Sequence, residues 1–137
     1  MNGELEEKLY IHKDELDYPS FIPVPIDLIK GDEFREVSAS AKLLYGLLLS
    51  RTYIANKNGM IDEKGRIFLY MTLEEVMQTF SVSLSKAKNM FRELSDINGK
   101  GIGLVIKNRE PGRPSKIYVL KFTEVRNKLT HSEGNKE

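Results

Sequence analysis

Two helical patterns followed by a basic hairpin pattern, in the second half of the sequence, constrain the fold of this chain most strongly. Thr72 and Glu75 have the spacing of a capping box, and apolar residues then recur with a helical period as far as Phe80. The next residues interrupt this pattern and include serines that can cap a second helix, which is predicted from Leu84 to about Ile97. Together these segments predict a helix-turn-helix.

The second predicted helix separates apolar from polar side chains. Its apolar positions share one side of the helix at the 3.6-residue period: Leu84, Ala87, Met90, Phe91, Leu94 and Ile97. The opposite side carries candidates for DNA contact: Ser85, Lys88, Asn89 and Arg92, with Lys86 on the flank. Arginine and lysine can donate to guanine, asparagine can pair with adenine, and serine suits a base or a phosphate. This distribution predicts a helix that reads the major groove of DNA, with an ordinary solvated face as the alternative.

The serine that precedes this helix has two possible roles. Ser83 is expected to act as the N-cap, and it can also touch a phosphate, since helix N-termini bind anions. We therefore include Ser83 among the candidate DNA contacts.

A basic β-hairpin is predicted after the second helix. Residues 104–109 and 115–122 have the character of strands, and residues 110–114 form a turn rich in proline and glycine. The hairpin carries four candidate contacts: Lys107, Arg109, Arg113 and Lys116. Such a tip suits phosphates or a narrow minor groove, whose negative potential attracts arginine. Helix, turn, helix and hairpin in this order predict a winged helix, with a plain polar turn as the alternative at the tip.

The distribution of charge supports a nucleic-acid partner more than the total does. The whole chain has a net charge of only +1. Residues 84–121, however, hold nine basic and three acidic side chains, whereas residues 1–20 hold two basic and six acidic ones. A local basic patch of this kind is the electrostatic signature of DNA binding.

Three further segments complete the predicted domain. Residues 39–56 form the longest and most apolar predicted helix, which follows a serine cap. Residues 60–70 alternate around a turn that contains Gly65 and predict an additional β-hairpin. The segment Phe21–Pro25 is apolar but has two prolines, so it can form only an edge strand. The expected fold class is α+β: a winged helix-turn-helix with an additional β-hairpin and an N-terminal edge strand.

The two ends of the chain are expected to lie outside this domain, which we assign to residues 21–122. Residues 1–20 form an acidic N-terminal arm, which is either a mobile leader or a segment that packs on a second subunit. Residues 123–137 are polar and predict a linker or tail.

No catalytic, metal or cofactor site is predicted. The sequence has no cysteine, and His12 and His131 lie in polar flanks, away from the periodic segments. The neighbouring carboxylates Glu74 and Glu75 point apart on a helix, and no Gly-Lys-Ser/Thr phosphate loop is present. The sequence has no apolar run of about 18–20 residues and no signal-peptide pattern, so a cytoplasmic, non-enzymatic protein without membrane contact is expected.

Three ordered blocks, at residues 41–51, 58–70 and 112–119, accompany the apolar segment Phe21–Pro25. They read AKLLYGLLLSR, NGMIDEKGRIFLY and GRPSKIYV. In this order they resemble the N-terminal domain of RepA-type plasmid replication initiators of Gram-positive bacteria, and the resemblance spans about residues 20–122.

The resemblance implies a winged-helix protein that binds repeated duplex DNA sites, or iterons, in a plasmid origin. It implies that the segment from Ser83 to Arg92 reads bases and that Lys107 to Lys116 forms the wing. It also implies a homodimer, and contacts with host replication proteins through a separate C-terminal domain that this chain does not include. A winged-helix transcriptional regulator would use the same surface, and a protein-interaction winged helix with a merely solvated basic face is the third possibility.

Overall fold

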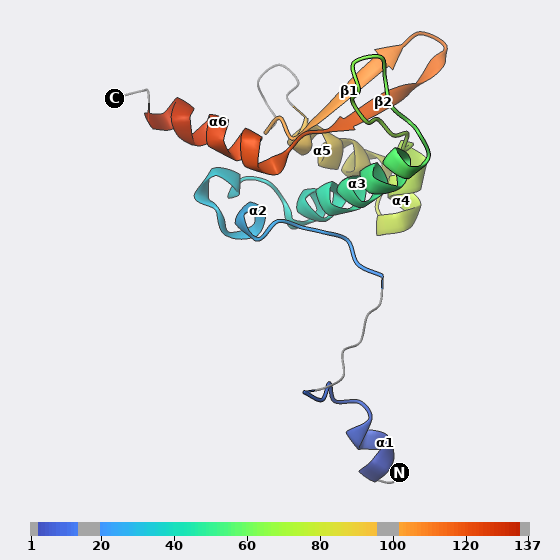
Figure 1. Cartoon of the computed structure of the whole chain (residues 1–137), viewed down its shortest axis with the longest axis vertical. Helices are drawn as coiled ribbons and strands as arrows, with labels where there is room; N and C mark the ends of the chain where they lie inside the picture. The colour runs from blue at the N-terminus through green and yellow to red at the C-terminus, as the bar shows by residue number, and fades with distance from the viewer. Residues whose placement is uncertain (1–2, 14–19, 96–101, 135–137) are drawn as a thin grey trace.

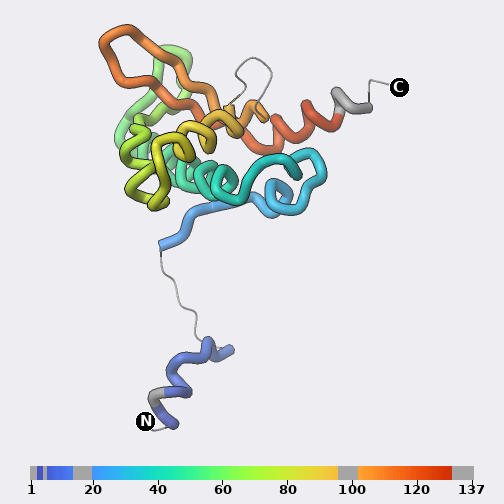
Figure 2. The backbone as a smooth tube through the Cα atoms, turned by 180° about the vertical axis from the view of Figure 1, so that it is seen from behind, coloured from blue at the N-terminus to red at the C-terminus, as the bar shows by residue number. Residues whose placement is uncertain are grey.

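The computed structural model describes residues 3–13, 20–95 and 102–134 of the chain, and Figure 1 shows the arrangement of its elements. In chain order these are α1 (Gly3–Glu7), α2 (Ile26–Lys30), the 3-10 helix η1 (Asp32–Phe34), α3 (Ala39–Lys57), α4 (Leu73–Phe80), α5 (Leu84–Leu94), β1 (Val105–Glu110), β2 (Arg113–Val119) and α6 (Phe122–Gly134). In Figure 1, α2 lies beside the start of α3, and the β1–β2 hairpin lies above α3. Figures 1 and 2 place α6 and the tip of the hairpin at opposite ends of this body.

The helix α3 forms the centre of the core, as its apolar pattern predicts. The Ser38 hydroxyl caps it by accepting a hydrogen bond from the Ala41 amide at 3.2 Å. The Tyr45 hydroxyl donates to the Leu120 carbonyl at 2.9 Å, which ties α3 to the end of the hairpin. Burial, with a smaller effect of Tyr53, raises the pKa of Tyr45 to about 12, so this hydroxyl stays neutral. Four residues of α3 are at most 1% exposed to solvent: Ala41, Leu44, Tyr45 and Leu48.

The helices α4 and α5 form the predicted helix-turn-helix, and both are capped as expected. The Thr72 hydroxyl accepts from the Glu75 amide at 3.0 Å, and the Ser83 hydroxyl accepts from an amide in the first turn of α5 at 3.1 Å. Ser81 ends α4 in the left-handed conformation, with a φ of 54°. The Glu75 carboxylate departs from the expected capping box, because it accepts a hydrogen bond from Arg51 of α3 at 3.0 Å.

The helix α5 ends at Leu94, whereas the sequence predicts an end near Ile97, which lies outside the described residues. The buried Ser95 hydroxyl donates to the Phe91 carbonyl at 2.8 Å. The backbone of Ser95 also forms a parallel bridge with Val105. The chain therefore leaves the helix at Ser95, where it begins to pair with β1.

The strands β1 and β2 form the predicted antiparallel hairpin, with an irregularity between Asn108 and Glu110. Leu69, between α3 and α4, exchanges two backbone hydrogen bonds with Ile117 of β2, at 2.9 and 2.8 Å. In chain order, the helix α3 is followed by Leu69, which pairs with β2, then by the helices α4 and α5, and then by the two-stranded wing β1–β2. This is the order of a winged helix, and the prediction of an α+β winged helix-turn-helix is confirmed.

The additional β-hairpin predicted for residues 60–70 forms only in part. Its turn is present, with Gly65 at a φ of 80°, and Ile61 and Ile67 form an isolated antiparallel bridge. The predicted strands do not extend further, because Leu69 pairs with β2 instead of with its own hairpin partner. This segment is therefore a loop that contacts the wing, and its residue Leu69 pairs with Ile117 of β2.

The predicted edge strand at Phe21–Pro25 is wrong, since the structure has no strand in this segment. Two of its residues are prolines, which have no amide hydrogen for a sheet ladder. The segment instead crosses α3 at Gly46, where a Cβ atom would lie 2.6 Å from Val24 Cγ2 and 3.1 Å from the Pro23 carbonyl oxygen. Glycine at this position is what lets the two backbones approach.

The sequence predicts a polar linker or tail for residues 123–137, and the part of it that the structure describes lies in the helix α6. The ring of Phe122 lies 5.2 Å from that of Phe34, between their centroids. Arg126 Nη1 lies 2.8 Å from a carboxylate oxygen of Asp27 in α2. Apolar residues at i, i+3 and i+7 carry the packing of α6 against the core: Phe122, Val125 and Leu129. The division of the chain into arm, domain and tail stays a prediction.

Candidate nucleic-acid interface

The helix α5 presents its predicted polar face to the surface. Ser85, Lys88, Asn89 and Arg92 are exposed, and Lys86 on the flank is half-buried. The opposite face lies in the core, with Ala87, Met90, Phe91 and Leu94 buried. Leu84, which the helical pattern places on the apolar side, remains 45% exposed at the start of the helix. The structure therefore brings together the base-reading candidates that the sequence predicts.

Asn89 and Arg92 interact directly on this face. Arg92 Nη1 donates a hydrogen bond to Asn89 Oδ1 at 2.6 Å, one helical turn away. The bond holds the guanidinium over the helix and occupies one acceptor site of the amide oxygen. The two side chains are therefore expected to approach a base or a phosphate as a pair.

Lys107 lies at the junction between the wing and α5. Its ammonium is 3.9 Å from the centre of the Phe91 ring, so the lysine stem covers this aromatic side chain. Burial lowers the pKa of Lys107, and the positive charge of Arg109 lowers it further. Lys107 therefore fastens β1 to α5 and brings a positive charge between the helix and the wing.

The tip of the wing carries two exposed arginines, Arg109 and Arg113. Gly112 between the strands has a φ of 76°, which suits glycine. Arg113 is 76% exposed, and its Nη1 atom lies 3.8 Å from the Glu110 carboxylate. At that distance the contact is a weak surface ion pair, so the guanidinium remains available to a phosphate.

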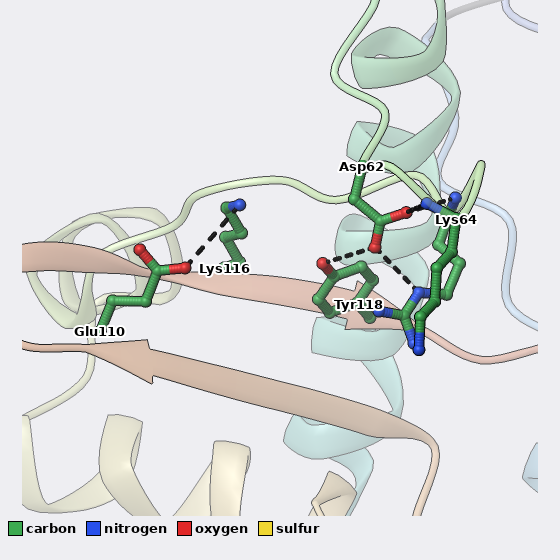
Figure 3. A network of polar contacts seen from close by, with 6 residues as sticks. Asp62, Lys64, Glu110, Lys116 and Tyr118 are labelled. Atoms are coloured by element: carbon green, nitrogen blue, oxygen red, sulfur yellow. Dashed lines mark hydrogen bonds and ion pairs between the residues drawn. The ribbon is translucent and has the colours of Figure 1, made fainter.

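Lys116 lies on the other face of the wing from Lys107. The register pairs Lys107 with Ile117 and Asn108 with Lys116, and neighbouring residues of a strand point to opposite faces. The Lys116 ammonium lies 4.7 Å from the centre of the Phe68 ring and 3.9 Å from a Glu110 carboxylate oxygen. Figure 3 shows Lys116 turned toward Glu110. Lys116 thus lies on the face of the wing that is turned away from α5.

A polar network around Asp62 supports the wing from that same face, and nothing in the sequence indicates it. The Asp62 carboxylate accepts hydrogen bonds from the Tyr118 hydroxyl at 2.9 Å and from Arg66 Nε at 2.8 Å (Figure 3). It also accepts backbone hydrogen bonds from Lys64 and Arg66, both at 2.9 Å. The guanidinium of Arg66 lies 5.1 Å from the centre of the Tyr118 ring.

The protonation of Asp62 follows from this network. Partial burial on its own raises the pKa of the carboxyl, but the hydrogen bonds from Arg66, Tyr118 and Lys64 together outweigh this effect. The pKa of Asp62 is therefore held well below its usual range. The turn at residues 62–66 is fastened to β2 by a carboxylate that stays charged.

Two further features concern the described ranges 3–13, 20–95 and 102–134. No helix within them is long and apolar enough to cross a membrane. They contain no cluster of three or more His, Cys, Asp or Glu side chains that could hold a metal ion.

The chain resembles several solved structures over nearly its whole length. A structure described as "N-Terminal domain of DNA binding protein" is 19% identical, with a TM-score of 0.63, over 98% of this chain and 95% of that one. "Structure of Rep-DNA complex" is 20% identical, with a TM-score of 0.62, over 100% and 96% of the two chains. "Structure of MDR initiator" is 20% identical, with a TM-score of 0.59, over 97% of each chain. These likenesses support the fold.

The family comparison covers the winged helix and most of α6. The family model for the N-terminus of replication initiator protein A (RepA) matches residues 20–132. No curated protein matches the sequence. The match includes α2 to α5, the wing and most of the C-terminal helix, so it extends beyond the blocks that carried the resemblance in the sequence. The chain belongs to the family of replication initiator protein A N-termini.

Proposed function

We propose that this chain is the DNA-binding domain of a plasmid replication initiator and binds repeated duplex sites, or iterons, at the replication origin. The observation that carries the proposal is the exposed basic face of α5 beside a basic wing, in a chain of the replication initiator family. The likeness to a structure described as a Rep–DNA complex supports a DNA partner. The role is one of binding and requires no chemical step by this domain.

In this proposal α5 enters the major groove and its polar face contacts base edges. Lys88 and Arg92 donate to guanine or to phosphate, and Asn89 pairs with adenine or orients Arg92. The start of the helix, with Ser83, Ser85 and Lys86, contacts the sugar-phosphate backbone.

The wing supplies contacts that do not depend on sequence. Arg109 and Arg113 at the tip reach phosphates or a narrow minor groove. Lys107 lies between the wing and α5, where the DNA backbone would pass from one groove to the next. Lys116 takes part through its support of the tip, because its ammonium is directed at Phe68 and Glu110.

We further propose that two copies of the chain bind neighbouring repeats as a homodimer, since paired sites are generally met by paired subunits. Contacts with host replication proteins are assigned to a C-terminal domain of the initiator, outside this winged helix.

The experiment is fluorescence anisotropy with duplexes that carry the origin repeats or shuffled repeats, over a series of salt concentrations. We expect a preference of about 10³-fold or more for the repeats and an affinity that falls steeply with salt. Salt-dependent binding without preference would mean that the site is wrongly assigned. Specific binding to a promoter rather than to the repeats would favour a transcriptional regulator. No binding at low salt would favour a protein-interaction module.

A further inference from the structure

A large cleft opens on the side of the wing that faces away from α5. Its volume is about 830 Å³. Ile106 of β1 and Tyr118 of β2 are cross-strand partners and form one wall, on the face opposite to Lys107. The other walls come from α3, the 60–70 loop and the start of α6, and include Leu49, Tyr53, Ile67 and Phe122.

The walls of this cleft are apolar and aromatic, and its charges are all of one sign. Tyr53 is 57% exposed and Ile106 is 50% exposed, so the cleft presents apolar surface to solvent. The charged side chains that it presents are Arg66 and Lys121, since the ammonium of Lys107 is directed at Phe91 on the other face, and its lining includes no carboxylate. Arg66 is held by Asp62, whereas Lys121 is exposed and makes no ion pair within the described part of the chain. The cleft thus suits an apolar segment that carries negative charge.

The N-terminal arm has these properties. Three consecutive large apolar side chains are exposed: Leu9 by 80%, Tyr10 by 68% and Ile11 by 71%. The surrounding residues 1–20 hold six acidic and two basic side chains, a net charge of −4. An exposed apolar run of this size within an acidic segment is an expected partner for an apolar cleft with a cationic rim.

The chain between the arm and the domain is long enough for the arm to reach the cleft. Pro25, at the end of the segment that leads from the arm, is itself part of the cleft lining. Ile11 is fourteen residues before Pro25, and a chain of that length extends over at most about 46–50 Å. A short tether of this kind gives an effective concentration on the order of millimolar, so even a weak contact is populated within one chain.

We propose that the segment Leu9–Ile11 of the N-terminal arm docks into this cleft of the same chain, with the arm carboxylates near Lys121 and Arg66. The docked arm covers the apolar walls of α3 and the wing. It lies on the face opposite to α5, so the polar face of α5 stays open to DNA. The contact forms without DNA, and its test is therefore independent of that function.

The absence of cysteine from the sequence allows a direct test by disulfide trapping. The full chain would carry Tyr10→Cys together with Tyr53→Cys, and the matched control would carry Tyr10→Cys together with Ser85→Cys on the exposed face of α5. Under mild oxidation in dilute solution, we expect an intramolecular disulfide to form at least about 10-fold faster in the cleft pair than in the control. Circular dichroism before oxidation verifies that both variants are folded.

A second measurement avoids the cysteines. Methyl NMR of the full chain and of a Leu9→Ser/Ile11→Ser variant should show shifted signals for Leu49 and Ile106 in the cleft, with Val76 of the core unchanged. Equal oxidation rates for the two cysteine pairs, or cleft methyl signals that do not move, would overturn the proposal. Disulfide-linked dimers as the main product would overturn it as well, because the occupant would then be the arm of a second copy.

Discussion

The Lys107 ammonium lies 3.9 Å from the centre of the Phe91 ring, and this contact joins the wing to α5. Phe91 is 4% exposed, so the lysine stem helps to cover a core side chain while its charge stays near the surface. The two elements proposed to contact adjacent grooves of DNA are therefore held together by a side chain that also carries charge. The contact holds β1 of the wing against α5.

Replacement of Lys107 separates its packing role from its charge. Lys107→Ala should lower the free energy of unfolding by about 1–2 kcal/mol, because Phe91 loses its cover and its cation–π contact. Lys107→Met, the matched control, keeps most of the cover and should lose less. Urea denaturation measures both variants. Equal losses would show that the charge, rather than the aliphatic stem, stabilises the junction.

Arg92 and Asn89 should behave as a coupled pair in DNA binding. Arg92→Ala is expected to weaken binding to the cognate repeat by about 1–3 kcal/mol and to relax discrimination at one base pair. Because Asn89 accepts a hydrogen bond from Arg92, the effects of Asn89→Ala and Arg92→Ala should not add in the double variant. Anisotropy titrations of the four proteins form the cycle. Additive losses would mean that the two residues act separately.

Arg113 and Lys116 should differ although both are basic residues of the wing. Arg113→Ala should weaken binding to most sequences and reduce the salt slope by about 1, as expected for the loss of a phosphate contact. Lys116→Ala should leave the salt slope nearly unchanged, because its ammonium faces Phe68 and Glu110. The measurement is affinity against salt concentration. A slope that changes equally for both would place Lys116 on the DNA.

The contribution of Asp62 to stability should depend on pH. Its pKa is lower in the folded chain than the unfolded value of about 3.9, so its stabilising effect is complete above that pH and declines as the pH falls toward the folded pKa. Asp62→Asn should therefore be less stable than the parent at pH 7, with a difference that narrows in acid. Urea denaturation between pH 7 and pH 2 measures this.

The control for Asp62 is Asp32→Asn, which removes a similar charge from a surface pair. Asp32 lies 2.7 Å from Arg35, and its side chain is 87% exposed. Such a pair contributes little, so this variant should remain within about 1 kcal/mol of the parent across the series. A gap for Asp62→Asn that stayed constant with pH would contradict the role of its charge.

Gly46→Ala should destabilise the domain although alanine favours helices. The new Cβ would lie 2.6 Å from Val24 Cγ2, and a β-branched side chain has little freedom to move away. We expect a loss of about 1–3 kcal/mol in urea denaturation, typical of overpacking. The double variant Gly46→Ala/Val24→Ala removes the closest of the new contacts and should recover part of the loss. A single variant as stable as the parent would show that the 21–25 segment moves freely.

Local signals in the sequence predicted the helix-turn-helix and the wing because each depends on neighbouring residues. The caps at Thr72 and Ser83 and the two faces of α5 follow from spacings of three and four residues. The hairpin follows from two strand patterns around a turn that contains Gly112. These features have no need of distant partners, so they can be read directly from the chain.

Other features depend on contacts between residues that are far apart in the sequence. The helix α6 packs on Phe34 and Asp27, which come early in the sequence of the domain. Because these partners are distant in sequence, the few apolar residues of α6 predict only a polar tail. Beyond the single bridge between Ile61 and Ile67, the 60–70 segment pairs with β2 through Leu69. No local pattern predicts the hydrogen bond between Asp62 and Tyr118, which are fifty-six positions apart in the sequence.

Periodicity and turn chemistry act over a few residues, so the sequence alone predicts the helices α3 to α5, their caps and the basic hairpin. The three ordered blocks carry the resemblance to the family. Long-range packing, in contrast, fixes which cations of the wing face α5. The register of the wing directs Lys107 toward Phe91 and Lys116 toward Phe68, because side chains alternate along a strand and the packing on each face differs. The fold also formed the cleft between α3 and the wing, whose walls come from segments that only long-range packing brings together.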